Sequence, residues 1–218
     1  MTRPPTLAAR RAWIGGTLAG ALGALPLGAL LGACAGTPRT DYHLLLDASA
    51  PSVPGPASPA APRVDKVLLV AAGTAPTLYD TDRMVFSADG ASRSYFQYGF
   101  WSERPQRRLL MLAEAHLGRA DAFRAVALST SGIRGELLLT LRLDALYVDD
   151  ATDPARARLA FAADLVDWRS RQLLARRSFE RSVPMTRRDA AAFAEAASRA
   201  AGALLDELTA WVVVASAG

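Results

Sequence analysis

The sequence predicts an α/β (α+β) fold, in which a mainly antiparallel sheet carries two principal helices on one face within a single domain. Residues 137–148 alternate apolar side chains with mixed ones, which is typical of a long strand with one buried face. Apolar residues recur three and four positions apart in residues 109–117 and 193–211, as in amphipathic helices. The chain has 218 residues, enough for one domain with a core of its own.

The first half of the chain contains several short strands. Apolar runs at residues 42–46 and 64–72 are consistent with strands. Between them, residues 47–63 are rich in Pro, Ala and Ser, a composition that buries little apolar surface and therefore predicts a flexible loop. Residues 83–86 and 93–101 flank the dipeptide Asp89-Gly90, which predicts a hairpin.

The second half begins with a helix over residues 103–117, with Pro105 near its start. A short strand is expected at residues 123–128, and a second hairpin at residues 158–183. The last helix has a visible start, where Thr186 is predicted to cap the backbone amides and Asp189 follows three residues on as a variant of the capping box.

The amino-terminal segment has the pattern of an export signal. Three arginines lie in the first eleven residues, and no charged residue occurs from Ala12 to Thr37. A membrane-spanning helix is the alternative, because about 20 apolar residues suffice to cross a bilayer. The many glycines and Pro26 weaken a helix and favour the signal.

The segment Leu31-Gly32-Ala33-Cys34 resembles the lipobox of bacterial lipoproteins. The resemblance implies a signal peptide over residues 1–33 and a mature chain of residues 34–218 that begins at an acylated Cys34. Acyl chains such as palmitate would anchor the protein to a membrane. Ala35 in place of an aspartate implies sorting to the outer membrane, with the domain facing the periplasm. A small buried cysteine is the alternative interpretation of Cys34.

Composition speaks against several classes of function. The net charge is +4, and three of the positive charges lie in residues 1–33, so the mature chain is close to neutral and no nucleic-acid partner is expected. Cys34 is the only cysteine, so no disulfide is expected once it is acylated. Seven arginines near the second hairpin would face anionic lipid, an acidic partner or only solvent: Arg169, Arg171, Arg176, Arg177, Arg181, Arg187 and Arg188.

Signals for catalysis are weak. The two histidines, His43 and His116, lack a nucleophile elbow and the further ligands that a zinc site needs. The acidic run of Asp149, Asp150 and Asp153 lacks the spacing of an EF-hand loop and favours a solvated turn over a calcium site. We therefore expect no enzyme activity, no cofactor and no metal.

Three stretches resemble a known family. These are "YHLLL" soon after Cys34, "RMVFSADGASRSYFQYGFWSERPQRRLLMLAEAHL", and "FRAV" at residues 123–126. Together they resemble the ABC-type transport auxiliary lipoprotein family, which includes paraquat-inducible protein C. The chain departs from the usual family pattern at residues 102–106 and 119–122.

The resemblance implies a docking component of an Mce-type system that moves lipid between membranes. Its partners would be an Mce-type substrate-binding protein and an ABC permease and ATPase complex, and the chain is open to assembly as a homo-oligomer. Four aromatic residues are candidate partner contacts, although they could equally pack under the first helix: Tyr95, Tyr98, Phe100 and Trp101. The alternatives are a structural lipoprotein for outer-membrane assembly or peptidoglycan binding, and a lipid-modifying enzyme.

Overall fold

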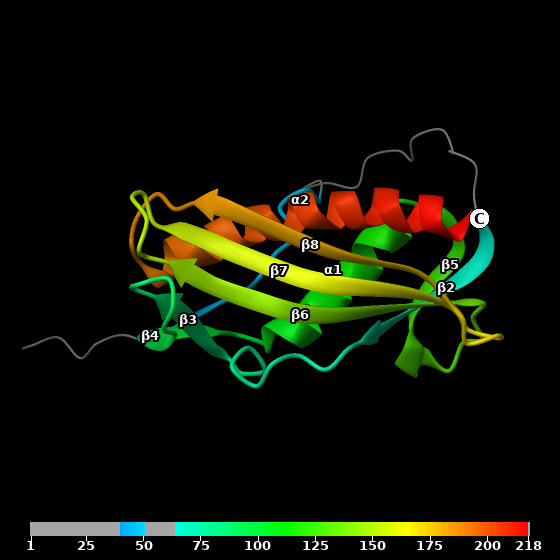
Figure 1. Cartoon of the computed structure of the whole chain (residues 1–218), viewed down its shortest axis with the longest axis horizontal. Helices are drawn as coiled ribbons and strands as arrows, with labels where there is room; N and C mark the ends of the chain where they lie inside the picture. Colours follow the sequence, from blue (N-terminus) through cyan, green and yellow to red (C-terminus); the bar gives the residue numbers. More distant parts are fainter. Residues whose placement is uncertain (1–39, 51–63, 218) are drawn as a thin grey trace, which may run out of the picture. The chain divides into compact units, whose positions relative to one another are not determined.

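The computed structural model describes residues 40–50 and 64–217 (Figure 1). The predicted signal peptide, Cys34 and residues 51–63 of the predicted loop lie outside these described residues. The elements follow one another as β1 Asp41–His43, β2 Val64–Ala72, β3 Arg83–Ser87, β4 Ser94–Trp101, α1 Pro105–Arg119, β5 Phe123–Leu128, a 3-10 turn Ser129–Ser131, β6 Leu137–Asp149, β7 Arg156–Asp167, β8 Leu173–Pro184 and α2 Ala190–Ser216. The predicted α/β domain with two principal helices is confirmed.

Strand β6 organises the sheet, because two different strands share one of its edges. Along its other edge it pairs with β7 from Leu137 to Asp149. On the shared edge, β2 pairs with residues 137–141 of β6, while β3 pairs only with Val148 and Asp149. Beyond them, β5 lies outside β2, and β4 and then β1 lie outside β3. The sheet therefore forks along β6.

The sheet is mixed in direction. The predicted hairpins are confirmed as the antiparallel pairs β3–β4 and β7–β8, and β6–β7 is antiparallel as well. The pairs β1–β4, β2–β5, β2–β6 and β3–β6 are parallel. The expected mainly antiparallel sheet thus describes its long strands, whereas the shorter strands join in parallel.

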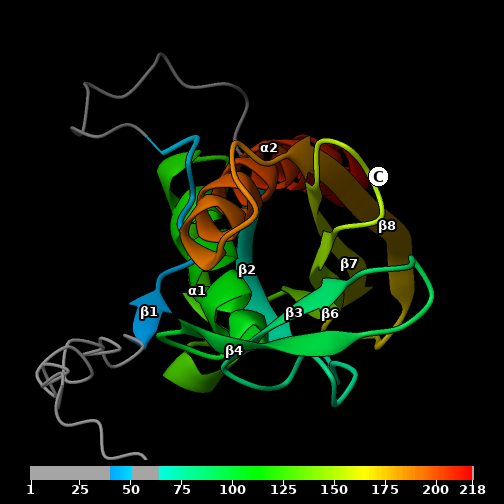
Figure 2. The same cartoon turned by 90° about the vertical axis from the view of Figure 1, so that its left-hand side faces the viewer.

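Both helices cover the same face of the sheet, as Figure 2 shows. Helix α1 contacts β2, β5 and β6, and α2 contacts β7 and β8. The apolar stripes predicted for them are buried in one core, which includes Leu109 and Leu117 of α1 and Phe193 and Leu204 of α2. Although α2 has 27 residues, no helix in residues 40–50 and 64–217 is long and apolar enough to cross a membrane.

The start of α2 differs from the prediction. The N-cap is Asp189, whose carboxylate accepts a hydrogen bond of 2.7 Å from the backbone N–H of Ala192. Thr186 lies exposed outside the helix, three residues earlier. The predicted cap at Thr186 is therefore wrong, because residues 186–189 form bends and helical structure begins only at Ala190.

Candidate functional site

Strand β4 presents one side to the core and the other to solvent. Trp101 is 2% exposed, and its ring lies edge-on to Phe193 of α2 at 5.3 Å between centroids. Gly99 lies on the same side, where an added Cβ would stand 3.0 Å from the Cβ of Ala190. The start of α2 therefore packs closely on β4, and Trp101 belongs to the core.

The opposite side of β4 joins β1 in an exposed aromatic surface. Tyr98 is 41% exposed and Phe100 is half-buried, in a part of β4 where the pairing with β3 shifts register. In the parallel β1–β4 pair, Tyr42 lies opposite Phe100 with 5.6 Å between ring centroids, and Tyr42 is 65% exposed. We call Tyr42, Tyr98 and Phe100 the aromatic edge.

Tyr95 lies apart from the aromatic edge. It is half-buried beneath the guanidinium of Arg83, 4.3 Å from the ring centroid. The four aromatic residues singled out from the sequence thus divide between three environments: Trp101 in the core, Tyr98 and Phe100 at the aromatic edge, and Tyr95 beside a cavity.

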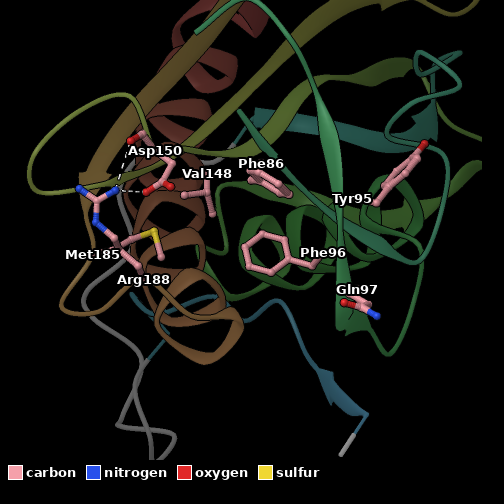
Figure 3. A pocket seen from close by; sticks show the side chains of 8 residues that line it. All are labelled: Phe86, Tyr95, Phe96, Gln97, Val148, Asp150, Met185 and Arg188. Atoms are coloured by element: carbon pink, nitrogen blue, oxygen red, sulfur yellow. Dashed lines mark hydrogen bonds and ion pairs between the residues drawn. The ribbon is translucent and has the colours of Figure 1, made fainter. Parts of the chain in front are cut away.

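That cavity has a volume of about 450 Å³ and lies between β3, β4, the end of β6 and the segment before α2 (Figure 3). It is lined by Phe86, Tyr95, Phe96, Gln97, Val148, Asp150, Met185 and Arg188. We call it the Phe96 cavity. Phe96 stacks on Phe193 and meets Phe86 edge-on, so the same aromatic group joins the core to the cavity.

Residues 44–50 follow β1 and cross the two helices, and we call them the strap. The sequence predicted a strand over residues 42–46, but β1 ends at His43. The carbonyl of Leu45 accepts a 2.8 Å hydrogen bond from Nε of Arg108 in α1, and the N–H of Leu46 donates to Oγ of Ser198 in α2. Because Leu45 is also buried, the strap is tied to both helices.

Asp47 is the most strongly held residue of the strap, although it opens the stretch predicted to be a flexible loop. Its side chain is 4% exposed, its Oδ2 lies 2.8 Å from Nδ1 of His116, and it forms an ion pair with Arg119. Burial raises the pKa of Asp47, but hydrogen bonds from Ser49 and His116 outweigh it and hold that pKa below its usual value. The Nε2 of His116 lies 3.3 Å from Asp206 of α2, so His116 joins three segments.

The sequence did not predict that His116 connects the strap to both helices. The only signal was the position of His116 on α1, one turn before Arg119. Nothing in the sequence placed Asp47 beside them, since 69 residues separate Asp47 from His116.

The acidic run after β6 forms a turn that faces an arginine. Arg188 forms an ion pair with the carboxylate of Asp150 and lies 3.5 Å from that of Asp153. In the part of the chain that the structure describes, no group of three or more His, Cys, Asp or Glu side chains is arranged to hold a metal ion.

Most of the clustered arginines are ion-paired within the domain. Arg176 binds Asp164 through two hydrogen bonds of 2.5 and 2.8 Å, and Arg177 and Arg181 both reach Glu207 of α2. Arg187 pairs with Asp189. This pattern favours an outer sheet face held by internal ion pairs.

A two-helix α/β domain with a forked mixed sheet is also found among solved structures. A crystal structure of a DUF330 protein from Xanthomonas campestris matches with a TM-score of 0.71 and 22% identity, covering 81% of this chain and 97% of that one. A second crystal structure, of an uncharacterized protein, matches with a TM-score of 0.58 and 10% identity over 69% and 94% of the two chains. Both likenesses concern the fold.

The sequence comparison, unlike the structural likenesses, identifies the family of this chain. The model of the ABC-type transport auxiliary lipoprotein component family matches residues 44–209, and the chain belongs to this family. No curated protein matches it significantly. The match spans the strap, all strands from β2 to β8 and most of α2, so it includes Tyr98 and Phe100 of the aromatic edge and the Phe96 cavity, whereas Tyr42 lies just before it.

Proposed function

We propose that this protein is an outer-membrane lipoprotein, acylated at Cys34, that faces the periplasm and docks an Mce-type ABC system for lipid transport between membranes. The observation that carries the proposal is membership of the transport auxiliary lipoprotein family. Because this family is not one of enzymes, we propose no catalytic step.

The spacing between the proposed anchor and the domain supports contact with the membrane surface. Cys34 precedes Asp41, the first residue of β1, by seven residues. A fully extended chain of this length spans about 25 Å at most. Acyl chains at Cys34 would therefore keep β1 and the aromatic edge close to the lipid head groups.

The aromatic edge is the surface that we propose for the protein partner. Exposed tyrosines are enriched in protein interfaces because they supply a large apolar area together with a hydroxyl group. Tyr42 and Tyr98 are both largely exposed here, and Phe100 lies beside Tyr42. Trp101 is buried, so we expect it to support this surface from the core.

The test is crosslinking in intact membranes, followed by affinity purification of the acylated protein and mass spectrometry. Recovery of an Mce-type protein with its permease is expected from the wild type and not from Cys34→Ala. Recovery of structural envelope proteins alone, from a well-expressed sample, would overturn the proposal and favour a structural lipoprotein.

A variant pair separates the aromatic edge from the rest of the surface. Tyr42→Ala combined with Tyr98→Ala is expected to lower recovery of the transporter. Ile133→Ala is the matched control, because Ile133 is 51% exposed and lies outside the aromatic edge. Equal loss in both variants would remove the aromatic edge as the contact surface.

A further inference from the structure

The Phe96 cavity has an apolar middle and a charged rim. Figure 3 shows Phe86, Phe96 and Val148 at its centre, with Arg188 and Asp150 on one side. Phe86 and Phe96 are only half-buried although they meet edge-on, so each keeps part of its ring accessible. A volume of about 450 Å³ lies within the range of small-molecule sites.

A second cavity, of about 500 Å³, adjoins the first. The two share Phe96, Gln97 and Arg188 among their lining residues, so they lie side by side. The second cavity is also lined by Asp41 and His43 of β1 and by the first residues of α2. Asp41, Arg188 and Asp189 are the charged side chains of its lining, which also includes the apolar rings of Phe96 and Tyr98.

An apolar middle beside a charged rim fits an amphiphile. A sugar or a nucleotide in the Phe96 cavity would leave its polar groups against Phe86, Phe96 and Val148, at the cost of hydrogen bonds to water. A hydrocarbon chain has no hydrogen bonds to lose there, and its transfer out of water is favourable by about 0.8 kcal/mol per methylene. The chemistry of the middle therefore selects an acyl chain.

The charged rim of the Phe96 cavity selects the head group. Arg188 provides a guanidinium that suits a phosphate, and Asp150, which is ion-paired with Arg188, provides a carboxylate that suits an ammonium group, so a head group would lie alongside this pair. Charges of both signs complement a zwitterion better than a simple anion. Arg188 is about half-exposed, so a phosphate can reach it from the second cavity.

We propose that the domain binds one acyl chain of a zwitterionic phospholipid in the Phe96 cavity, with the phosphate at Arg188 and the rest of the head group in the adjoining cavity. Delivery of that lipid from a nearby membrane rests on the proposed acylation of Cys34. The fit between cavity and ligand does not depend on it.

Photocrosslinking tests this inference with the full-length acylated protein in lipid nanodiscs. The nanodiscs contain phosphatidylcholine and a small share of phosphatidylcholine with a diazirine in its acyl chain. After illumination, labelled peptides are mapped by mass spectrometry. We expect labels on β3, on β4 around Phe96 and on the segment containing Met185.

The chain contains its own control. A polar cavity of about 330 Å³, lined by Thr140, Asp164 and Arg176 among others, lies on the β2, β6, β7 and β8 strands. Labels confined to the aromatic edge, equal labelling of this polar cavity, or no labels in the Phe96 cavity would each overturn the proposal.

A variant pair adds a second measurement. Phe86→Asp places a carboxylate against the chain and is expected to lower labelling of the Met185 peptide by about tenfold. Val126→Asp is the matched control, because Val126 is likewise a half-buried strand residue but does not line the cavity. Folding of both is checked by circular dichroism, and if Phe86→Asp does not fold, the wild-type labelling map decides alone.

This outcome is separate from that of the proposed function. Labelling requires no transporter, so a labelled cavity without recovery of a transporter would support lipid binding and remove the docking role. Recovery of the transporter without cavity labels would support the docking role and remove lipid binding in the cavity.

Discussion

The side-chain amide of Gln106 completes the hydrogen bonding of Leu143 at the point where the sheet forks. Oε1 of Gln106 accepts a 2.6 Å hydrogen bond from the N–H of Leu143, and Nε2 donates to the carbonyl of Leu141 at 2.9 Å. Leu141 is the last β6 residue paired with β2, and Leu143 lies between it and the residues paired with β3. One side chain from the first turn of α1 thus takes the place of a missing strand residue.

Replacing Gln106 by Leu should therefore destabilise the domain. The N–H of Leu143 would lose its partner in a buried position, which costs about 1–3 kcal/mol. Urea unfolding measures the loss, with Gln172→Leu in the exposed turn between β7 and β8 as the control. Equal stability of the Gln106→Leu protein and the wild type would show that the amide has no such role.

Two helical glycines should respond in opposite directions to alanine. In α2, a Cβ on Gly202 would lie 2.5 Å from the backbone N of Ser49, so Gly202→Ala must displace the strap. In α1, Gly118 has open space around it, and Gly118→Ala should stabilise by about 1 kcal/mol through helix propensity. Thermal melts and hydrogen exchange at residues 45–49 compare them. Faster exchange only in Gly202→Ala is expected, and a stabilised Gly202→Ala protein with a protected strap would contradict the close contact.

Asp47→Asn should loosen the strap in a pH-dependent way. Loss of charged hydrogen bonds to His116 and Arg119 is expected to cost about 1.5–3 kcal/mol at pH 7. The folded-state pKa of Asp47 lies below its usual value of 3.8, so its stabilising effect is complete above that pH and declines as pH falls through the lower folded pKa. Unfolding at pH 7 and at pH 3 measures the difference between the two proteins. A difference that grows towards low pH would reverse this sign.

Two substitutions test which residue caps the N-terminus of α2. Asp189→Ala should destabilise by about 1 kcal/mol, because the N–H of Ala192 loses its acceptor. Thr186→Ala should change little, since Thr186 is exposed and lies before the cap. Chemical unfolding of both variants decides, and a larger loss in Thr186→Ala would restore the cap expected from the sequence.

Asp89 in the turn between β3 and β4 should stay ionised in mild acid. Hydrogen bonds from the backbone N–H and hydroxyl of Ser92, and from the N–H of Ala91, lower its pKa from 3.8 to about 2. Its contribution to turn stability is therefore complete above pH 3.8 and is lost as pH falls towards 2. An NMR titration of the carboxyl carbon follows this directly. Ser92→Ala should move the midpoint upward, and an unshifted midpoint near 3.8 in the wild type would exclude the turn geometry.

Local periodicity was enough to predict most of the elements. The alternation through β6 and the stripe from Phe193 to Trp211 repeat over many residues, so burial of one side sets their type. Both hairpins have short turns, which bring neighbouring segments together without information from elsewhere. Parallel pairs such as β2–β6 join segments that are distant in sequence, and no local pattern specifies them.

For the candidate site, the sequence did not show which residues of β4 face the core and which face solvent. Five aromatic residues within seven positions of β4 carry no mark of which ones face the core. Packing against α2 goes with that choice: Gly99 leaves little space to Ala190 and Trp101 is buried, whereas Tyr98 is exposed. The Phe96 cavity could not be predicted either, since its lining comes from four separate parts of the chain.

The strap also has a mechanical consequence for a tethered protein. If Cys34 is held in a membrane while the domain is pulled by a partner, the tension enters through β1. It is then resisted by the pairing of β1 with β4, by the buried Leu45 and by the contacts of Asp47 with α1. Because these attachments follow one another along the chain, the pairing of β1 with β4 takes the load before the contacts that tie the strap to the helices.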